Sequence, residues 1–414
     1  MEQQKVLPHL FRTEYQKMIA VLVRLFGTQF LEVAEDIVSD SFLAAAELWG
    51  LKGLPENPAG WLYVTAKNKA LDHLRRNKIF RDKVTPQVAL SRASSAEDFD
   101  LDLSDTHVKD SQLAMLFVVC DPINNPAAQV ALALNLLCGF GASEIASAFL
   151  TDREVIYKRL QRAKKMLQDK ALDVQQPSER QIKDRLPQVL LVLYLLFNEG
   201  YFSEGADNVI REELCQEAMR LVILLTESPL TALPSTNALL ALMCFHSSRF
   251  DARQDTNGAL VLYQDQDRTA WDQQLINKGR YYLQKAMTAE APASKYHLEA
   301  SIAFWHSFPE EQPQKWTQIL QLYDLLLEQH YAPMTALNRI YALSKVAGKQ
   351  KALKAMAEIH LDQHYLYHSL LAELYMGEDN QKAEQHLHLA KQLAKSPGGR
   401  RILDGKLRIL RGQL

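Results

Sequence analysis

Apolar residues recur along this chain in alternating steps of three and four, the spacing that places them on one face of an α-helix. Near the start of the chain, this spacing occurs at Phe11, Tyr15, Met18, Leu22 and Leu25. Glycine and proline, which interrupt helices, account for only 16 and 15 of the 414 residues. The pattern predicts an all-α protein, and a chain of this length predicts two or three domains.

One long stretch breaks the helical pattern. Residues 84–110 are dominated by serine, aspartate and other polar residues, and such a composition buries too little apolar surface to offset chain entropy. We therefore expect a flexible acidic linker between two helical modules, residues 8–83 and residues 111–170, that need not touch each other. A polar segment then leads to a helical extension at residues 186–414.

The first module is predicted to contain an amphipathic helix with one apolar and one acidic face. The apolar stripe consists of Val38, Phe42, Ala45 and Trp49. Glu32, Asp36 and Asp40 lie on the opposite side. Such an acidic face is either solvated or binds a basic protein partner.

The helix predicted after Pro58, a residue that suits a first helical turn, begins with aromatic residues and ends with cations. Ala66, Ala70 and Leu74 would pack inward, which leaves the polar residues facing outward. The arginines and lysine near the end of the helix could then bind phosphates, and the Asn68 amide could bind a base edge. Trp61 and Tyr63 could stack on unpaired bases. An amphipathic helix with core aromatics and solvated cations explains the pattern equally well. The outward residues would be Thr65, Asn68, Lys69, Asp72, Arg75 and Arg76.

Residues 139–167 have the layout of a helix-turn-helix. A short helix around residues 144–149 is followed by a turn at Leu150, and Thr151 with Glu154 suggests a capping box for the next helix. Its core face would be Ile156, Leu160, Ala163 and Leu167. Its outer face would be Arg153, Tyr157, Lys158, Gln161, Arg162, Lys164 and Lys165. Basic residues on this face suit entry into a DNA major groove, although many helix pairs share the pattern by chance.

Cysteine usage and apolar runs indicate a cytoplasmic protein that is not bound to a membrane. The longest apolar run, residues 189–197, is about half of a membrane span, and the first residues lack an apolar signal core. No pair of cysteines has the CxxC spacing of a zinc or redox site, so we expect buried, reduced thiols. The cysteines are Cys120, Cys138, Cys215 and Cys244.

Catalytic and metal-binding patterns are weak. His360, His364 and His368 recur every four residues, but no acidic or thiol ligand completes a metal site nearby in the sequence. The charged segment at residues 265–271 is more typical of helix caps and ion pairs than of an active site. We therefore expect no enzyme, no metal and no cofactor. The hypothesis that the extension contains a hydrolase or a ligand sensor is supported by these two clusters alone.

Two segments of the extension, around Ala352 and Ala383, look like second helices of successive helix pairs. They lie roughly one tetratricopeptide period apart. Neighbouring pairs would bury each other's apolar faces, which predicts a small solenoid.

The order of the motifs is more specific than any one of them. AEDIVSDSFLAAAELW, NPAGWLYVTAKNKALDHLRR and SEIASAFLTDREVIYKRLQRAKK together resemble an extracytoplasmic-function (ECF) sigma factor of bacterial RNA polymerase, over roughly residues 8–170. YLLFNEGYFSEG and APMTALNRIYALSKVAG resemble the subgroup with a tetratricopeptide-like C-terminal extension. The chain departs from that subgroup at residues 347–349, where Ala-Gly-Lys replaces an Asp-Gly-Pro type of turn.

The resemblance implies a non-enzymatic promoter-specificity subunit that acts on the bacterial nucleoid. Residues 8–83 would be sigma region 2 and would bind the clamp helices of the largest catalytic subunit of core RNA polymerase. Residues 111–170 would be sigma region 4 and would lie at the flap region of the polymerase. The polymerase contacts would be Glu35, Asp36 and Asp40. The −10 DNA contacts would be Trp61, Asn68, Lys69, Asp72, Arg75 and Arg76. The −35 DNA contacts would be Arg153, Tyr157, Lys158, Arg159, Arg162 and Lys165.

The resemblance also implies that the extension takes over part of the control, and a regulatory protein bound to it is a further partner to consider. The alternative is a helical-repeat adaptor whose helix-turn-helix binds duplex DNA as an ordinary regulator. The two functions differ in one requirement, because an ordinary regulator needs no affinity for RNA polymerase.

Overall fold

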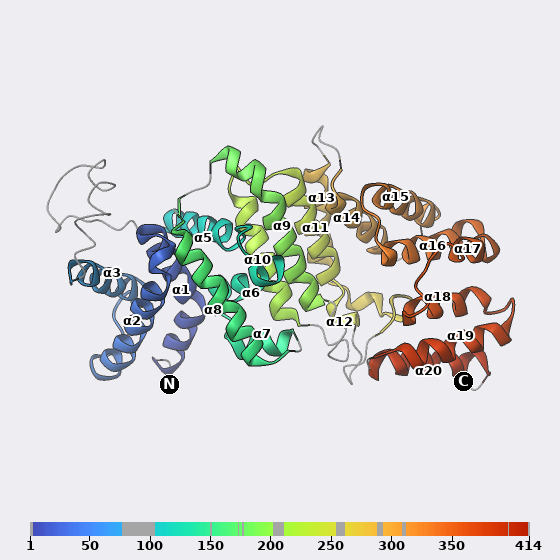
Figure 1. Ribbon diagram of the computed structural model, residues 1–414, viewed down its shortest axis with the longest axis horizontal. Coiled ribbons are helices and arrows are strands. Elements are labelled where there is room, and N and C mark those ends of the chain that lie inside the picture. The colour runs from blue at the N-terminus through green and yellow to red at the C-terminus, as the bar shows by residue number, and fades with distance from the viewer. Residues whose placement is uncertain are drawn as a thin grey trace. The chain divides into compact units, whose positions relative to one another are not determined.

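In the computed structural model, the described residues form nineteen α-helices and a few 3₁₀ turns, and no β-strand occurs among them (Figure 1). The predicted all-α class is confirmed. The structure describes residues 3–76, 104–149, 151–172, 174–175, 178–201, 211–253, 261–287, 293–308, 312–395 and 397–412.

The chain divides into two compact units, Met1–Leu193 and Tyr194–Leu414. The division falls within helix α9 (Glu179–Tyr201). Both of the modules predicted before residue 170 therefore belong to the first unit.

Three helices, α1 (Gln3–Phe26), α2 (Leu31–Lys52) and α3 (Pro58–Arg76), begin the first unit and pack against one another. The predicted apolar stripe of α2 is confirmed, because Val38, Phe42, Ala45 and Trp49 are all buried. Helix α3 begins at Pro58 as predicted.

Four more helices complete most of this unit. They are α5 (Asp105–Val119), α6 (Pro126–Leu136), α7 (Ala142–Ala148) and α8 (Arg153–Lys170). Helix α5 begins inside the segment predicted to be a linker, because the Ser104 hydroxyl accepts a hydrogen bond from the His107 amide at 3.3 Å and caps the helix. The second module was predicted to begin at residue 111, but its first helix begins at Asp105. The linker residues 84–103 lie outside the described part of the chain.

The two sets of helices pack directly against each other, a contact that the sequence had left open. Arg24 of α1 donates a hydrogen bond to the Ser111 hydroxyl of α5 at 3.3 Å. Thr28, in the short 3₁₀ turn η1 (Thr28–Phe30), is buried and donates to the Leu167 carbonyl of α8 at 2.7 Å. The Leu172 amide donates back to the Thr28 hydroxyl at 2.8 Å. A satisfied buried hydroxyl of this kind holds the end of α8 against the first helices.

The second unit continues from α9 through eleven further helices. Their bounds are α10 (Glu212–Glu227), α11 (Pro234–Ser247), α12 (Phe250–Arg253), α13 (Gln273–Ala286), α14 (Lys295–His306), α15 (Lys315–Gln329), α16 (Pro333–Ala347), α17 (Lys349–Met356), α18 (Tyr365–Tyr375), α19 (Asn380–Leu393) and α20 (Pro397–Leu410).

Helix pairs occur in the second unit where they were predicted. Helix α17, which contains Ala352, packs on α16, and α19, which contains Ala383, packs on α18. Both alanines are fully buried at these contacts. Gly348 joins α16 to α17 with a φ of 86°, so the turn retains the one residue type that adopts this conformation without strain.

The four cysteines are free; Cys120, Cys215 and Cys244 are buried as predicted, whereas Cys138 is only half-buried. Burial raises the pKa of each of the three buried thiols to about 12, so they remain protonated and unreactive. No helix in the described part of the chain combines the length and apolar content that a bilayer-spanning segment requires.

Candidate nucleic-acid and polymerase interfaces

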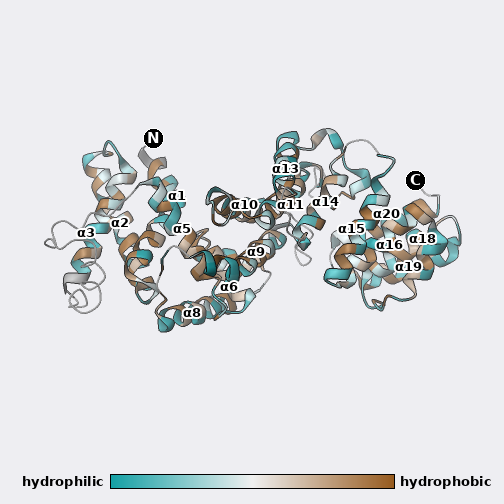
Figure 2. Ribbon diagram, turned by 90° about the horizontal axis from the view of Figure 1, so that it is seen from above, coloured by the Kyte–Doolittle hydropathy of each residue, from teal (hydrophilic) through white to brown (hydrophobic). Residues whose placement is uncertain are grey.

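Helix α8 has one apolar face and one strongly hydrophilic face (Figure 2). The predicted core face is confirmed, because Ile156, Leu160, Ala163 and Leu167 are buried. The predicted capping box is wrong. The helix begins at Arg153 with Asp152 as its N-cap, and the Glu154 carboxylate instead lies 3.3 Å from the Lys158 ammonium group.

The outer face of α8 exposes most of the cations predicted to bind DNA. Arg153, Lys158, Arg162 and Lys165 are exposed, and so is Tyr157. Arg159 is half-buried. Among the described residues, Arg153, Arg162 and Lys165 have no ion-pair partner, so their charges are available to an external anion. A row of unpaired cations on one helix face is the feature that phosphate backbones bind.

Lys164 does not face solvent as predicted. Its ammonium group lies 2.6 and 2.9 Å from the two carboxylate oxygens of Glu35 on α2, and the two side chains are only 17% and 25% exposed. This ion pair joins the basic helix to the acidic face of α2. It also occupies one of the three carboxylates predicted to contact RNA polymerase.

The other two acids of that face remain accessible. Asp36 and Asp40 are exposed. The Asp40 carboxylate is 3.9 Å from the ammonium group of Lys69 on α3, at the outer limit of an ion pair, and the Asp40 side chain is 66% exposed. Pairs of this kind contribute little to stability and are easily exchanged for another partner.

Helix α3 presents the predicted polar residues unevenly. Asn68 and Asp72 are exposed, whereas Lys69 is half-buried. Arg75 and Arg76 lie in the last turn of the helix, but their side chains are outside the described part of the structure.

The aromatic residues of α3 are packed more tightly than predicted. Trp61 is half-buried, with its ring 5.4 Å from that of Trp49 in an edge-to-face arrangement. Tyr63 is buried, its hydroxyl donates to the Glu14 carboxylate at 3.1 Å, and burial raises its pKa. The proposal that Tyr63 stacks on DNA bases is therefore wrong for this conformation, since its ring belongs to the core between α1 and α3.

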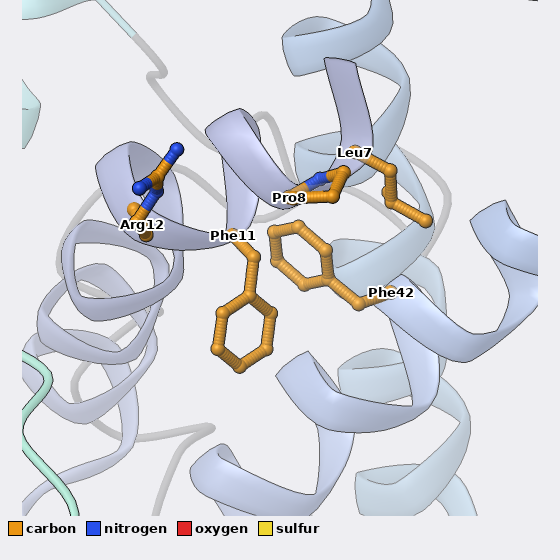
Figure 3. A pocket seen from close by; sticks show the side chains of 5 residues that line it. All are labelled: Leu7, Pro8, Phe11, Arg12 and Phe42. Carbon is orange, nitrogen blue, oxygen red and sulfur yellow. The ribbon is translucent and has the colours of Figure 1, made fainter. Parts of the chain in front are cut away.

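An exposed apolar pocket lies between α1 and α2 (Figure 3). It is lined by Leu7, Pro8, Phe11, Arg12 and Phe42. The Phe11 ring is 5.2 Å from the Phe42 ring and remains 48% exposed, although its spacing had placed it on the apolar face of α1. Phe42 also lies two residues from Asp40, so an apolar surface and an acidic surface occupy the same helix.

The sequence did not reveal one buried polar site that organises the basic helix. Asp121, between α5 and α6, is 4% exposed and accepts from Lys170 of α8 at 3.0 Å and from Arg185 of α9 at 3.1 Å. A single aspartate before a proline gave no signal of these distant partners.

The charge clusters of the second unit behave as structural elements. His368 stacks on His386, and His364 caps α18 by accepting from the Leu366 amide at 3.2 Å. Asp267 caps the 3₁₀ turn that begins at residue 268, as expected of the segment at residues 265–271, and Asp272, just after this segment, caps α13. Within the described ranges, no group of three or more histidine, cysteine or acidic side chains has an arrangement that could hold a metal.

Comparison with known proteins identifies two segments. Residues 10–79, which contain most of α1 and all of α2 and α3, match the family described as Sigma-70 region 2. Residues 185–287 match a family of unknown function, DUF6596. The region 2 match supports a sigma-factor-like role in transcription initiation. The sigma-70 family consists of transcription factors that are not catalysts. No solved structure matches the chain significantly.

A full-length relative extends the comparison. The uncharacterized protein R00370 of Rhizobium meliloti (strain 1021) is 33% identical over 359 residues, which cover 85% of this chain and 83% of that protein. Identity at this level over most of both chains indicates a common fold and descent. The chain therefore belongs to the same family as R00370 and carries a sigma-70 region 2 domain at its N-terminal end.

Proposed function

We propose that the protein is an ECF-type sigma factor that directs bacterial RNA polymerase to specific promoters in the cytoplasm. The observation that carries the proposal is the combination of a sigma-70 region 2 domain with a second, separate cationic surface, the outer face of α8. A sigma factor needs two such DNA contacts, one for the melted −10 element and one for the duplex −35 element.

The −35 element would be bound by the outer face of α8, within a region 4 module at residues 111–170. Arg153, Arg162 and Lys165 are exposed and lack ion-pair partners among the described residues, so phosphates or guanine edges can approach them. Arg162→Ala is expected to weaken the upstream DNase footprint and to lower the salt dependence of binding by about one phosphate equivalent. The control is Arg180→Ala, another exposed arginine outside α8.

The −10 element would be bound by α3. Asn68 and Asp72 are exposed on one side of this helix, and Arg75 and Arg76 follow in its last turn. Lys69 is close enough to contribute if it leaves Asp40. Trp61 would contribute one ring edge beside Trp49 rather than a free ring for stacking.

Core RNA polymerase would be bound by the acidic face of α2, at the clamp helices of the largest subunit, with region 4 at the flap region. Asp36 and Asp40 are accessible for this contact, whereas Glu35 must first exchange its partner Lys164. The apolar pocket between α1 and α2, to which α2 contributes Phe42, would add apolar contact area to a charged interface.

The extension would be a tetratricopeptide-like domain that positions or gates the two DNA contacts. The α16–α17 and α18–α19 pairs support this proposal, since paired helices that bury small residues at their contacts are the unit of such solenoids. A regulatory protein could bind its surface. The effect of the extension on promoter activity would be measured by transcription assays. These would compare the full chain with a chain whose extension carries substitutions but remains folded.

Binding to purified core RNA polymerase distinguishes the proposed sigma factor from an ordinary duplex-binding regulator. The full chain is expected to co-purify with core enzyme, and Asp36→Arg with Asp40→Arg is expected to abolish this while leaving the chain folded. The control reverses two exposed acids elsewhere in the first unit, Asp169→Arg with Glu179→Arg. Duplex binding by the wild type without polymerase affinity would support the ordinary regulator.

A further inference from the structure

The second unit contains a cavity of about 670 Å³ that is lined by α9, α11, α14, α16, α18 and α20 among other segments. This volume lies in the range of roughly 300–1,000 Å³ that is usual for small-molecule sites. All lining residues fall within Tyr194–Leu414, so the cavity belongs to one compact unit. Its wall combines tyrosine rings with charged and histidine side chains, as expected of a site that selects a polar ligand.

Arg249, which follows α11, lines the cavity as a cation without a counter-charge. Its guanidinium group donates to the Tyr201 hydroxyl at 3.2 Å, lies 3.4 Å from His246 Nδ1, and sits 5.5 Å from the centre of the Tyr263 ring. No carboxylate of the described residues pairs with it. A half-buried cation without an acidic partner is costly, and an anionic ligand would remove that cost.

A second arginine and two neutral histidines lie at the same end of the cavity. Arg253 also lines it, with its Cζ 3.9 Å from the centre of the Tyr201 ring and only 8% of the residue exposed. His246 and His306 are held neutral, because burial and then the neighbouring cations lower the pKa of both, that of His306 to about 3. The His306 Nδ1 atom is buried and has no hydrogen-bond partner among the described residues.

Apart from the two arginines, the charged residues of the wall are Lys406 and Glu299. Lys406 is already paired with Glu373 at 3.0 Å. Glu299 is the one acid among the lining residues of the described chain, and it accepts from the Tyr194 hydroxyl at 3.4 Å. Burial raises the pKa of Glu299, and the nearby ammonium group of Lys295 opposes this shift, so Glu299 already has a cationic neighbour of its own.

We propose that the cavity binds a small organic anion, whose carboxylate or phosphoryl group accepts hydrogen bonds from Arg249 and whose body packs against the tyrosine rings. Guanidinium groups match both anions in geometry and charge, and tyrosine rings favour a planar body that can stack on them. The site does not depend on the proposed role in transcription, because binding is a property of the second unit and is measured directly.

The test uses isothermal titration calorimetry of the full chain at constant ionic strength. The probes are benzoate and phenyl phosphate, with benzamide and phenol as their uncharged counterparts. At least one anion is expected to bind with a Kd in the millimolar range or below, and its uncharged counterpart is expected to bind at least about tenfold more weakly. Arg249→Gln should weaken the anion by at least about tenfold, whereas Arg408→Gln, an exposed arginine outside the cavity, should not.

Hydrogen exchange of the wild-type chain provides a second measurement that needs no variant. The bound anion is expected to slow exchange from α11 through α12, a stretch that includes Arg249 between the two helices, and in α14, which carries His306. The proposal is overturned if neither anion binds at millimolar concentration, or if the uncharged probes bind equally well. It is also overturned if a folded Arg249→Gln chain keeps the full affinity, or if the protection lies outside this unit.

Discussion

The ion pair between Lys164 and Glu35 is predicted to couple α8 to α2 energetically. At an effective dielectric constant of about 20, two unit charges about 4 Å apart attract by about 4 kcal/mol. Desolvation and lost side-chain freedom oppose this attraction, and exposed pairs retain about 0.2–1 kcal/mol. Because these side chains are only 17% and 25% exposed and make two close contacts, we expect a coupling of about 1–2 kcal/mol.

A double-mutant cycle with Lys164→Met and Glu35→Gln isolates this coupling from other effects of each substitution. The readout is the opening free energy of α8 from native-state hydrogen exchange, which does not require the whole two-unit chain to unfold in one step. The control cycle uses Lys158→Met and Glu154→Gln on the same helix, where the pair is 3.3 Å apart and mostly exposed. We expect about 0.5 kcal/mol or less there. A coupling for Lys164–Glu35 no larger than that of the control would refute the inference that the pair fastens α8 to α2.

Three further substitutions test the packing and electrostatics of each unit. Asp121→Asn leaves Arg185 and Lys170 without their buried partner and is expected to cost about 2 kcal/mol in urea unfolding; an unchanged midpoint would contradict the buried-pair assignment. Gly279→Ala places a Cβ 2.7 Å from the Phe245 ring and is expected to cost about 1–3 kcal/mol; a more stable variant would show that the contact has room. His306 has a folded pKa of about 3 against 6.5 when unfolded, so the unfolded state binds the extra proton and stability falls as pH drops from 6.5 towards 3. His306→Gln should flatten that slope, by up to about 1.4 kcal/mol per pH unit, in unfolding measured across this range; an equally steep profile would exclude His306 as its source.

The sequence predicted features that depend on local spacing. The buried stripes of α2 and α8 followed from apolar residues three and four apart, and the start of α3 followed from Pro58. These signals suffice because one face of a helix is buried whatever it packs against. The helix pairs around Ala352 and Ala383 were found for the same reason.

The errors arose where a side chain had two physically reasonable environments. A cation on a helix surface either faces solvent or meets an acid, and the partner of Lys164 is 129 residues away in the chain. Tyr63 suits a base stack and a protein core equally well until its hydrogen bond to Glu14 is known. Phe11 continues the periodicity of α1 but lies where the bundle ends.

The sequence did not predict certain helix ends or the cavity, and the reasons differ. Ser104 caps α5 inside a stretch whose average composition is that of a linker, so a single good N-cap was outweighed by its polar neighbours. Thr151 and Asp152 are both good N-caps, and neither the spacing to Glu154 nor propensity decides between them. The cavity gathers residues from helices between α9 and α20, and no local pattern predicts such a meeting.

Transcription by purified core RNA polymerase tests the central claim most directly. With the full chain added, start-site mapping on bacterial genomic DNA is expected to give discrete start sites that share −10 and −35 elements, and these should be absent without the chain. Asp36→Arg with Asp40→Arg should remove all of these starts, and Arg162→Ala should weaken them in proportion to the quality of their upstream element. If active core enzyme yields no additional start sites with the wild-type chain, the protein is not a promoter-specificity subunit.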